Sequence, residues 1–192
     1  MGPIAERRDG LYTYGDYLKW DDDERWELID GVAYNMTPAP SRFHQQVSAE
    51  LCTQFVTLLR GGSCKVYSAP FDVRLPEGDE ADEAVKTVVQ PDISIICDPS
   101  KLDDKGCKGS PDLIVEILSQ ATARKDMKEK LLRYERAGVR EYWIADPVGK
   151  MITVYKRTDG GLFGRPDVYG EEERIKVGIL DLEVDLKTVF SE

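Results

Sequence analysis

Apolar residues recur along the chain at two spacings, which predict a set of strands and two long helices. Alternating or continuous apolar runs indicate strands, and apolar positions three or four residues apart indicate helices. The long helices are expected at residues 41–62 and 123–137, and the strands include "WELID", "GVAYN", "CKVYSAPFDVRL", "VVQPDISIIC", "PDLIVEILS", "REYWIADP", "MITVYKR" and "ERIKV". This mixed order predicts an α+β (mixed α/β) fold, in which helices flank a central mixed sheet extended by an N-terminal hairpin and C-terminal strands.

Capping and turn residues mark several boundaries of these elements. Asp30-Gly31, between two short apolar runs, is typical of a β-hairpin turn. Ser41 is a good helix N-cap, and Gly61 is a stop signal after that helix. The second long helix is expected to begin after Thr122 and to end at Gly138.

The run "PDLIVEILS", residues 111–119, carries two acidic residues inside an otherwise apolar strand. Because side chains alternate between the faces of a strand, Asp112 and Glu116 share one face with Leu118. An ionised carboxylate in apolar surroundings is costly unless it has a partner or binds a metal. Glu116 is therefore a candidate functional residue. Asp112 is a weaker candidate, because an Asp after a proline often only opens a strand.

A second apolar strand, "QPDISII", carries Asp92 near its start. If the two strands are neighbours, Asp92 and Glu116 converge and their charges repel. A shared proton, a basic partner or a divalent cation would relieve this repulsion. The alternatives are an Asx-type turn after Pro91 for Asp92 and a solvated position at the edge of the sheet for Glu116.

The helix at residues 123–137 offers a basic partner. On a helical wheel at about 100° per residue, one apolar stripe contains Ala123, Met127, Leu131, Tyr134 and Ala137. Lys130 lies inside this stripe, where lysine rarely occurs without a reason, and is predicted to reach Glu116. The alternative is a lysine that snorkels past the apolar face. The other charged residues fall off the stripe: Lys125, Lys128 and Glu129 are expected in solvent, and Asp126 at the edge.

Length and charge set limits on the function. With 192 residues, of which 41% are hydrophobic, the chain is expected to form one domain over residues 1–192, with a loose tail at 1–10. The formal net charge of -10 argues against a protein that coats nucleic acid through its average charge. A nuclease remains compatible, because local basic residues and bound divalent cations can offset the acidic average.

The cysteines and the N-terminus favour a cytoplasmic protein. Cys52, Cys64, Cys97 and Cys107 form no C-x-x-C pair and are expected to be free thiols in a reducing compartment. The first ten residues lack an apolar signal core, and no apolar run approaches membrane-spanning length. We therefore expect a cytoplasmic protein without a membrane segment.

Four segments together resemble the Uma2 family of restriction endonucleases, within the PD-(D/E)xK nuclease superfamily. They are "WELIDGVAYNMTPAPSRFHQQVSAEL", "QPDISII", "GSPDLIVEILS" and "KDMKEKLLRYERAGVREYWIADP". The resemblance spans roughly residues 12–157 and is most specific between Asp112 and Pro147. It implies a restriction-endonuclease-like fold for the chain.

The resemblance also implies roles for individual residues. In the superfamily pattern an Asp on one strand is followed by (D/E)-x-K on the next, so Asp92 and Glu116 match the two carboxylates that bind the metal ion. Leu118 stands where the pattern has lysine, and in this family the lysine is placed on the following helix, which fits Lys130.

Two further site residues, Glu27 of "WELIDG" and His44 of "RFHQQ", are implied to assist near the metal. Without that role, Glu27 would be an exposed hairpin residue and His44 a hydrogen-bonded core residue. The implied activity is Mg²⁺- or Mn²⁺-dependent cleavage of DNA by a homodimer. Two alternatives stay open: a nuclease fold that binds or regulates without turnover, favoured by Leu118 and the acidic charge, and a metal-dependent phosphodiesterase acting on RNA or nucleotides.

Overall fold

The computed structural model describes residues 10–20, 24–36, 39–120 and 122–191, so all of the predicted loose tail except Gly10 lies outside the described residues. Its helices are α1 (Tyr14–Tyr17), α2 (Arg42–Leu58), α3 (Leu131–Ala137) and α4 (Leu186–Val189), with 3₁₀ turns at Asp82–Ala84 and Pro99–Lys101 and a π-helical segment at Lys125–Lys130. Within the described residues, none of these helices combines the length and apolar character needed to cross a membrane.

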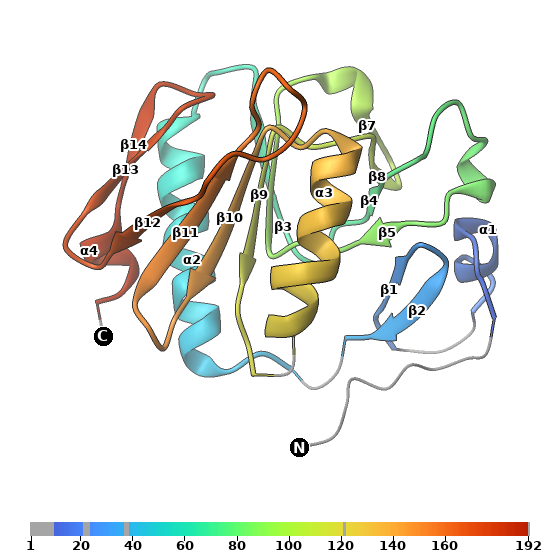
Figure 1. Ribbon diagram of the computed structural model, residues 1–192, viewed down its shortest axis with the longest axis horizontal. Helices are drawn as coiled ribbons and strands as arrows, with labels where there is room; N and C mark the ends of the chain where they lie inside the picture. Colours follow the sequence, from blue (N-terminus) through green and yellow to red (C-terminus); the bar gives the residue numbers. More distant parts are fainter. Residues whose placement is uncertain (1–9, 21–23, 37–38, 121, 192) are drawn as a thin grey trace.

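A six-stranded mixed sheet forms the centre of the fold, in the order β12-β11-β10-β9-β6-β3 (Figure 1). Its strands are β3 (Lys65–Ser68), β6 (Ile93–Ile96), β9 (Leu113–Ile117), β10 (Glu141–Asp146), β11 (Met151–Lys156) and β12 (Asp167–Gly170). Strands β9 and β10 are parallel, and the other neighbours are antiparallel. The predicted α+β fold with a central mixed sheet is confirmed.

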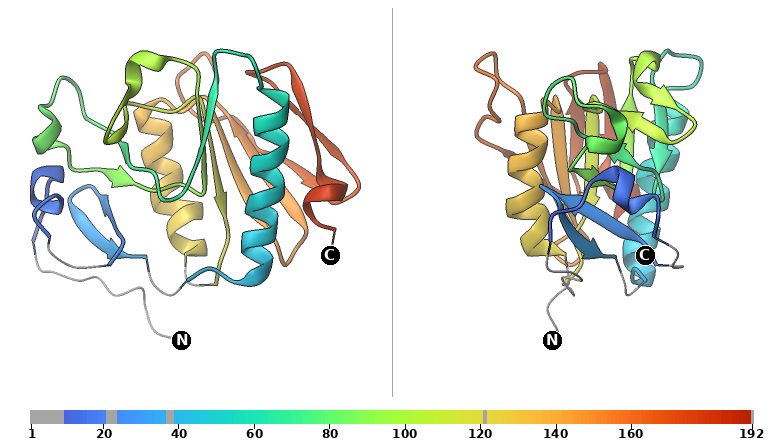
Figure 2. Two further views of the ribbon diagram at one scale, coloured as in Figure 1. Left: turned by 180° about the vertical axis from the view of Figure 1, so that it is seen from behind. Right: turned by 90° about the vertical axis from the view of Figure 1, so that its right-hand side faces the viewer.

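Helices α2 and α3 cover opposite faces of this sheet, as the end-on view in Figure 2 shows. The first residues of both helices lie at the same end of the sheet (bottom of Figure 1). Ser41 caps α2 by accepting a hydrogen bond from the His44 N–H at 3.2 Å. The helix that contains α3 ends at Gly138, whose φ of 91° suits a left-handed cap. Both predicted helix boundaries are therefore confirmed.

A second six-stranded sheet, in the order β2-β1-β5-β4-β8-β7, lies beside the first. It contains β1 (Trp26–Ile29), β2 (Val32–Asn35), β4 (Val73–Arg74), β5 (Val88–Val89), β7 (Leu102–Asp103) and β8 (Gly106–Lys108). The predicted hairpin turn at Asp30-Gly31 connects β1 to β2. The C-terminal extension is a separate hairpin of β13 (Arg174–Val177) and β14 (Leu182–Asp185), which precedes α4.

The apolar character of "VVQPDISIIC" predicted one strand, but the structure divides this run into two. Residues 88–89 form β5 in the second sheet, and residues 93–96 form β6 in the central sheet. Pro91 lies between them and has no N–H to donate to a ladder. The chain therefore changes sheets at Gln90-Pro91-Asp92.

The alternation predicted for β9 divides the core into two layers. Leu113, Val115 and Ile117 pack with residues of α2, whereas Ile114 belongs to the cluster around Tyr134 of α3. On the α2 side, Leu51 is fully buried. Helices thus cover both faces of the sheet. Glu116 shares the face of Ile114 and therefore points to the α3 side.

Replacement of Leu51 by Ala should lower the free energy of unfolding by about 3 kcal/mol, because it removes buried methyl groups and leaves a cavity. Leu58→Ala on the same helix is the matched control, since Leu58 is 45% exposed. The control should change stability by less than about 0.5 kcal/mol. Urea unfolding of both variants measures the difference, and equal losses would contradict the packing of α2 on the sheet.

The expectation of four free thiols is wrong for two of the cysteines. Cys64 and Cys97 form a disulfide, with Cα atoms 3.8 Å apart, whereas Cys52 and Cys107 are free. Lys65 pairs with Ile96 in the β3–β6 ladder, so the two cysteines face each other one residue beyond it. The sequence did not reveal which strands are neighbours, and therefore gave no sign of this pairing.

Candidate active site

Two carboxylates meet where β6 and β9 run side by side. Ile93 pairs with Val115 in this antiparallel ladder, which makes Asp92 and Glu116 the next two residues to face each other. The Ile117 N–H donates a hydrogen bond of 2.8 Å to Asp92 Oδ2 and fixes that carboxylate against β9. The predicted neighbourhood of the two strands is confirmed.

Glu116 is buried and receives two donors from the helix that follows its strand. Lys130 Nζ lies 2.8 Å from Glu116 Oε1, and the Tyr134 hydroxyl donates to the same oxygen at 2.6 Å. The prediction that Lys130 reaches Glu116 is confirmed, and the alternatives of a snorkelling lysine and a solvated carboxylate are wrong. Tyr134 was expected only as a core residue, and it also orients the carboxylate.

Glu27 joins this cluster from the second sheet. Its side chain on β1 is fully buried, so the alternative of an exposed hairpin residue is wrong. Oε1 lies 2.7 Å from Lys130 Nζ and accepts the Gln90 N–H at 2.9 Å, while Oε2 lies 2.6 Å from Lys125 Nζ. Glu27, Lys130 and Glu116 thus form a continuous ionic bridge between the two sheets.

Burial acts on the two glutamates with different outcomes. Burial opposes ionisation of Glu27, but Lys130 and Lys125 outweigh it and lower the pKa of Glu27 to about 2. Burial raises the pKa of Glu116 to about 8, because Lys130 offsets it only in part and Asp126 and Asp92 add repulsion. The Glu116 and Glu27 carboxylates overcome the effect of burial on Lys130 and raise its pKa well above the ordinary value. Lys130 is therefore an ammonium ion at neutral pH.

The site holds more acidic than basic groups. Glu27, Asp92, Glu116 and Asp126 contribute four carboxylates, and among the described residues two lysines, Lys125 and Lys130, contact them. Burial also raises the pKa of Asp126, which is 2% exposed. Excess buried carboxylate charge is relieved by protons or by an added cation.

His44 lies on the α2 side of Asp92. Its Nε2 is 3.4 Å from Asp92 Oδ2, and among the described residues Nδ1 has no hydrogen-bond partner. Burial lowers the pKa of His44, but the contact with Asp92 outweighs it and the net shift is upward. His44 is thus brought to the site, where its nearest ionic partner is Asp92.

The expectation that Lys125 lies in solvent and Met127 in the apolar stripe is wrong. Lys125 is 4% exposed and contacts Glu27, whereas Met127 is 55% exposed. Residues 125–130 are π-helical, and bonds between residues five apart replace the four-residue repeat on which the wheel was based. Two lysines spaced by five residues, with Asp126 and Glu129 between them, were the sequence signal for this arrangement.

Two residues considered from the sequence lie outside the cluster. Asp112 accepts hydrogen bonds from the Cys97 N–H at 2.8 Å and from Arg140 at 3.2 Å, at the other end of β9. Leu118, which stands in the position of the superfamily lysine, packs against the apolar cluster around Tyr134. Lys130 therefore supplies the only side-chain ammonium that contacts Glu116 among the described residues.

The donor set suits a hard cation with few protein ligands. Within the described part of the chain, no three His, Cys, Asp or Glu side chains gather as a metal cage. Mg²⁺ does not need such a cage, because it is usually bound by one or two carboxylates together with waters and substrate phosphates. Asp92, which is 21% exposed, and Glu116 beside it fit this requirement.

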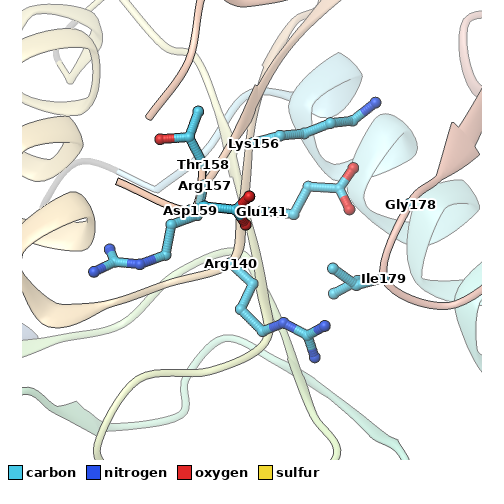
Figure 3. Close-up of a pocket in the computed structure, with 8 residues that line it drawn as sticks. All are labelled: Arg140, Glu141, Lys156, Arg157, Thr158, Asp159, Gly178 and Ile179. Carbon is cyan, nitrogen blue, oxygen red and sulfur yellow. The ribbon is translucent and has the colours of Figure 1, made fainter. Parts of the chain in front are cut away.

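A separate cavity of about 360 Å³ lies at the opposite end of β10 (Figure 3). Glu141 at the start of β10 pairs with Leu113, whereas Ile144 pairs with Glu116. The basic residues that line it have partners: Arg140 contacts Asp112, Lys156 contacts Asp167 and Arg157 donates to the Glu135 carbonyl. The cavity is lined by Arg140, Glu141, Lys156, Arg157, Thr158, Asp159, Gly178 and Ile179, and it shares no residue with the Glu116 cluster.

Comparisons with known proteins identify relatives of this chain. The chain is 27% identical over 149 residues to "Uncharacterized protein slr1290" of Synechocystis, covering 76% of this chain and 74% of that protein. A crystal structure from Anabaena variabilis, described as "a putative nuclease belonging to DUF820", has a TM-score of 0.72 and 17% identity, covering 93% and 97% of the two chains. This likeness shows that the two chains share the mixed α+β fold. The profile of the Uma2 family, described as "Putative restriction endonuclease", matches residues 14–187, and the chain belongs to that family.

Proposed function

We propose that this protein is a metal-dependent endonuclease that hydrolyses phosphodiester bonds in DNA. The observation that carries the proposal is the position of Lys130, whose ammonium contacts Glu116 while Asp92 lies across the ladder from that glutamate. Membership of the Uma2 family supports the nuclease assignment. The excess of carboxylates over lysines supports the requirement for a cation.

Asp92 and Glu116 would hold Mg²⁺ or Mn²⁺. The bound ion would supply a polarised phosphate oxygen and a water of lowered pKa. Asp92 is oriented for this task by the Ile117 N–H, and Glu116 by Tyr134. His44 would help to orient Asp92, because its Nε2 lies 3.4 Å from Oδ2.

Lys130 would act as a cation rather than as a base. Hydrolysis adds negative charge to the phosphate oxygens while water attacks and the P–O bond breaks. The raised pKa of Lys130 keeps its proton in place, so the ammonium can stabilise this charge and orient water. Glu27, which receives Lys130 on its other side, would fix the ammonium in position.

Plasmid nicking tests the proposed activity. Purified protein should convert supercoiled plasmid to the open circle with Mg²⁺ or Mn²⁺, and not with excess EDTA. Asp92→Asn should lower the rate by about 100-fold or more, because each tenfold loss corresponds to about 1.4 kcal/mol and metal assistance contributes several kcal/mol. Lys128→Met, at an exposed lysine, is the control and should nick like wild type.

The substrate used in the assay separates this proposal from its rivals. If the protein cleaves an RNA oligonucleotide or a nucleotide phosphodiester but leaves the plasmid uncut, its substrate belongs to that class and is not DNA. If the protein binds duplex DNA but does not cleave it with either Mg²⁺ or Mn²⁺, the result would favour a nuclease fold that binds DNA without turnover. A DNA duplex has two strands, and we expect two copies of the chain to present one site to each.

A further inference from the structure

We propose that Lys125 is a second functional lysine of this site, a positioning residue that keeps Lys130 between Glu27 and Glu116. The inference rests on the proposed function. It starts from the contact between Lys125 Nζ and Oε2 of the fully buried Glu27, at 2.6 Å.

The contacts of Glu27 show why a second lysine matters. Three donors share its two oxygens: Lys125 takes Oε2, while Lys130 and the Gln90 N–H take Oε1. Lys130 is therefore held through one oxygen, and the same ammonium contacts Glu116 Oε1 at 2.8 Å. Saturation of Glu27 Oε2 by Lys125 leaves Lys130 free to bridge the two glutamates.

The π-helical segment provides the geometry for this arrangement. Lys125 and Lys130 are five residues apart, and π-helical hydrogen bonds join residues five apart, so both side chains reach the same carboxylate. In a regular α-helix at about 100° per residue, residues five apart point in clearly different directions. The π-helix thus brings a lysine that would face solvent into the site. Lys125 Nζ also lies 5.4 Å from the centre of the Tyr34 ring, which adds a second attraction on the same side.

Loss of Lys125 should change the position of Lys130. A buried carboxylate oxygen without a donor is costly, and Lys130, whose Nζ lies 2.7 Å from Oε1 of the same carboxylate, is a flexible donor beside it. Its Nζ is expected to take both oxygens of Glu27 and to move away from Glu116. The chain would keep its metal-binding carboxylates but lose the cation beside them.

The decisive variant is Lys125→Met, which keeps the length of the side chain and removes its charge. Its crystal structure should show Lys130 Nζ bound by Glu27 Oε2 and no longer within hydrogen-bond distance of Glu116. A Lys130 that keeps both contacts would overturn the proposal. This readout does not depend on whether the protein cleaves DNA, so failure of the nuclease assignment and failure of this inference are distinguishable.

Kinetics provide the second readout. For Lys125→Met, kcat for oligonucleotide cleavage should fall about tenfold or more, which corresponds to about 1.4 kcal/mol or more, with little change in KM. Calorimetric Mg²⁺ affinity should be equal or higher, because a nearby positive charge has been removed. Lys125→Arg, which can still pair with Glu27, should restore most of kcat.

Other kinetic outcomes overturn the proposal. An unchanged kcat would show that Lys130 does not need Lys125. A fall in kcat accompanied by a parallel loss of Mg²⁺ affinity would show a general disturbance of the site. If Lys125→Met does not fold, Lys125→Gln takes its place, since its amide can donate to Glu27 without supplying charge. Because Glu27 Oε2 then keeps a donor, Lys130 should keep both of its contacts and kcat should stay near that of wild type. A displaced Lys130 in this variant would overturn the proposal.

Discussion

Lys130→Met should reduce the rate of DNA cleavage by about 100- to 1,000-fold, the range expected when one preorganised electrostatic contact to the transition state is removed. Lys130 is the ammonium that bridges Glu27 and Glu116 at 2.7 and 2.8 Å. Its loss leaves the phosphate charge that develops in the reaction without a compensating cation. Metal affinity should not fall, because neither Asp92 nor Glu116 has been changed.

Single-turnover cleavage and Mg²⁺ calorimetry on the same preparation measure both effects. Lys128→Met is the matched control, because Lys128 is exposed in the same π-helical segment. A variant that loses metal binding together with cleavage would indicate a structural lysine. A variant that cleaves at the wild-type rate would contradict the role given to Lys130 altogether.

Glu116 should make the free energy of unfolding of the metal-free protein fall as pH rises from about 5.5 to 7.5. One proton retained by the folded state changes this free energy by about 1.4 kcal/mol per pH unit, so the total loss is up to about 3 kcal/mol. The pKa of Glu116 is raised from 4.5 to about 8 in the fold. Between these values the folded protein retains a proton that the unfolded chain has released. Stability is therefore highest below the unfolded pKa and is lost as pH approaches the folded one.

Glu27 acts in the opposite direction and at lower pH. Its pKa is lowered from 4.5 to about 2, so its contribution to stability is present at neutral pH and is lost as pH falls through this range. Urea unfolding of wild type and Glu116→Gln between pH 5.5 and 7.5 isolates the Glu116 effect, because Glu27 stays ionised throughout. The variant should show a much flatter profile.

Addition of Mg²⁺ should reduce the loss of wild-type stability at higher pH, because a cation bound by Glu116 replaces the proton. For the same reason, cleavage should become faster as pH rises towards about 8, the value to which burial raises the pKa of Glu116. A stability profile for Glu116→Gln as steep as that of wild type would contradict this assignment of the proton.

The main site residues could be predicted because they break the apolar pattern of their own elements. Glu116 in a buried strand, Asp92 at the start of the neighbouring strand and Lys130 in an apolar helical stripe each carry a charge where the pattern calls for an apolar side chain. The structure brings all three together with Glu27. Local alternation and helical spacing contain this information, since they fix which face a residue occupies.

Other features depend on contacts between distant segments. The burial of Glu27 follows from the pairing of β1 with β5, which the hairpin sequence does not specify. The Cys64–Cys97 disulfide follows from the pairing of β3 with β6. The prediction that Lys125 lies in solvent is wrong for a different reason. A helical wheel assumes a uniform α-helix, and the helix is π-helical at this point.

Calorimetric titration of Mg²⁺ and Mn²⁺ into the metal-free protein at pH 8 tests the central claim most directly. We predict that wild type binds a divalent cation, and that Asp92→Asn and Glu116→Gln each weaken binding at least about tenfold, or about 1.4 kcal/mol. Wild type that binds neither ion at millimolar concentration would contradict the account. Variants that bind the cation as tightly as wild type would also contradict it. In either case Asp92, Glu116 and Lys130 would form a buried ionic network that does not bind a metal.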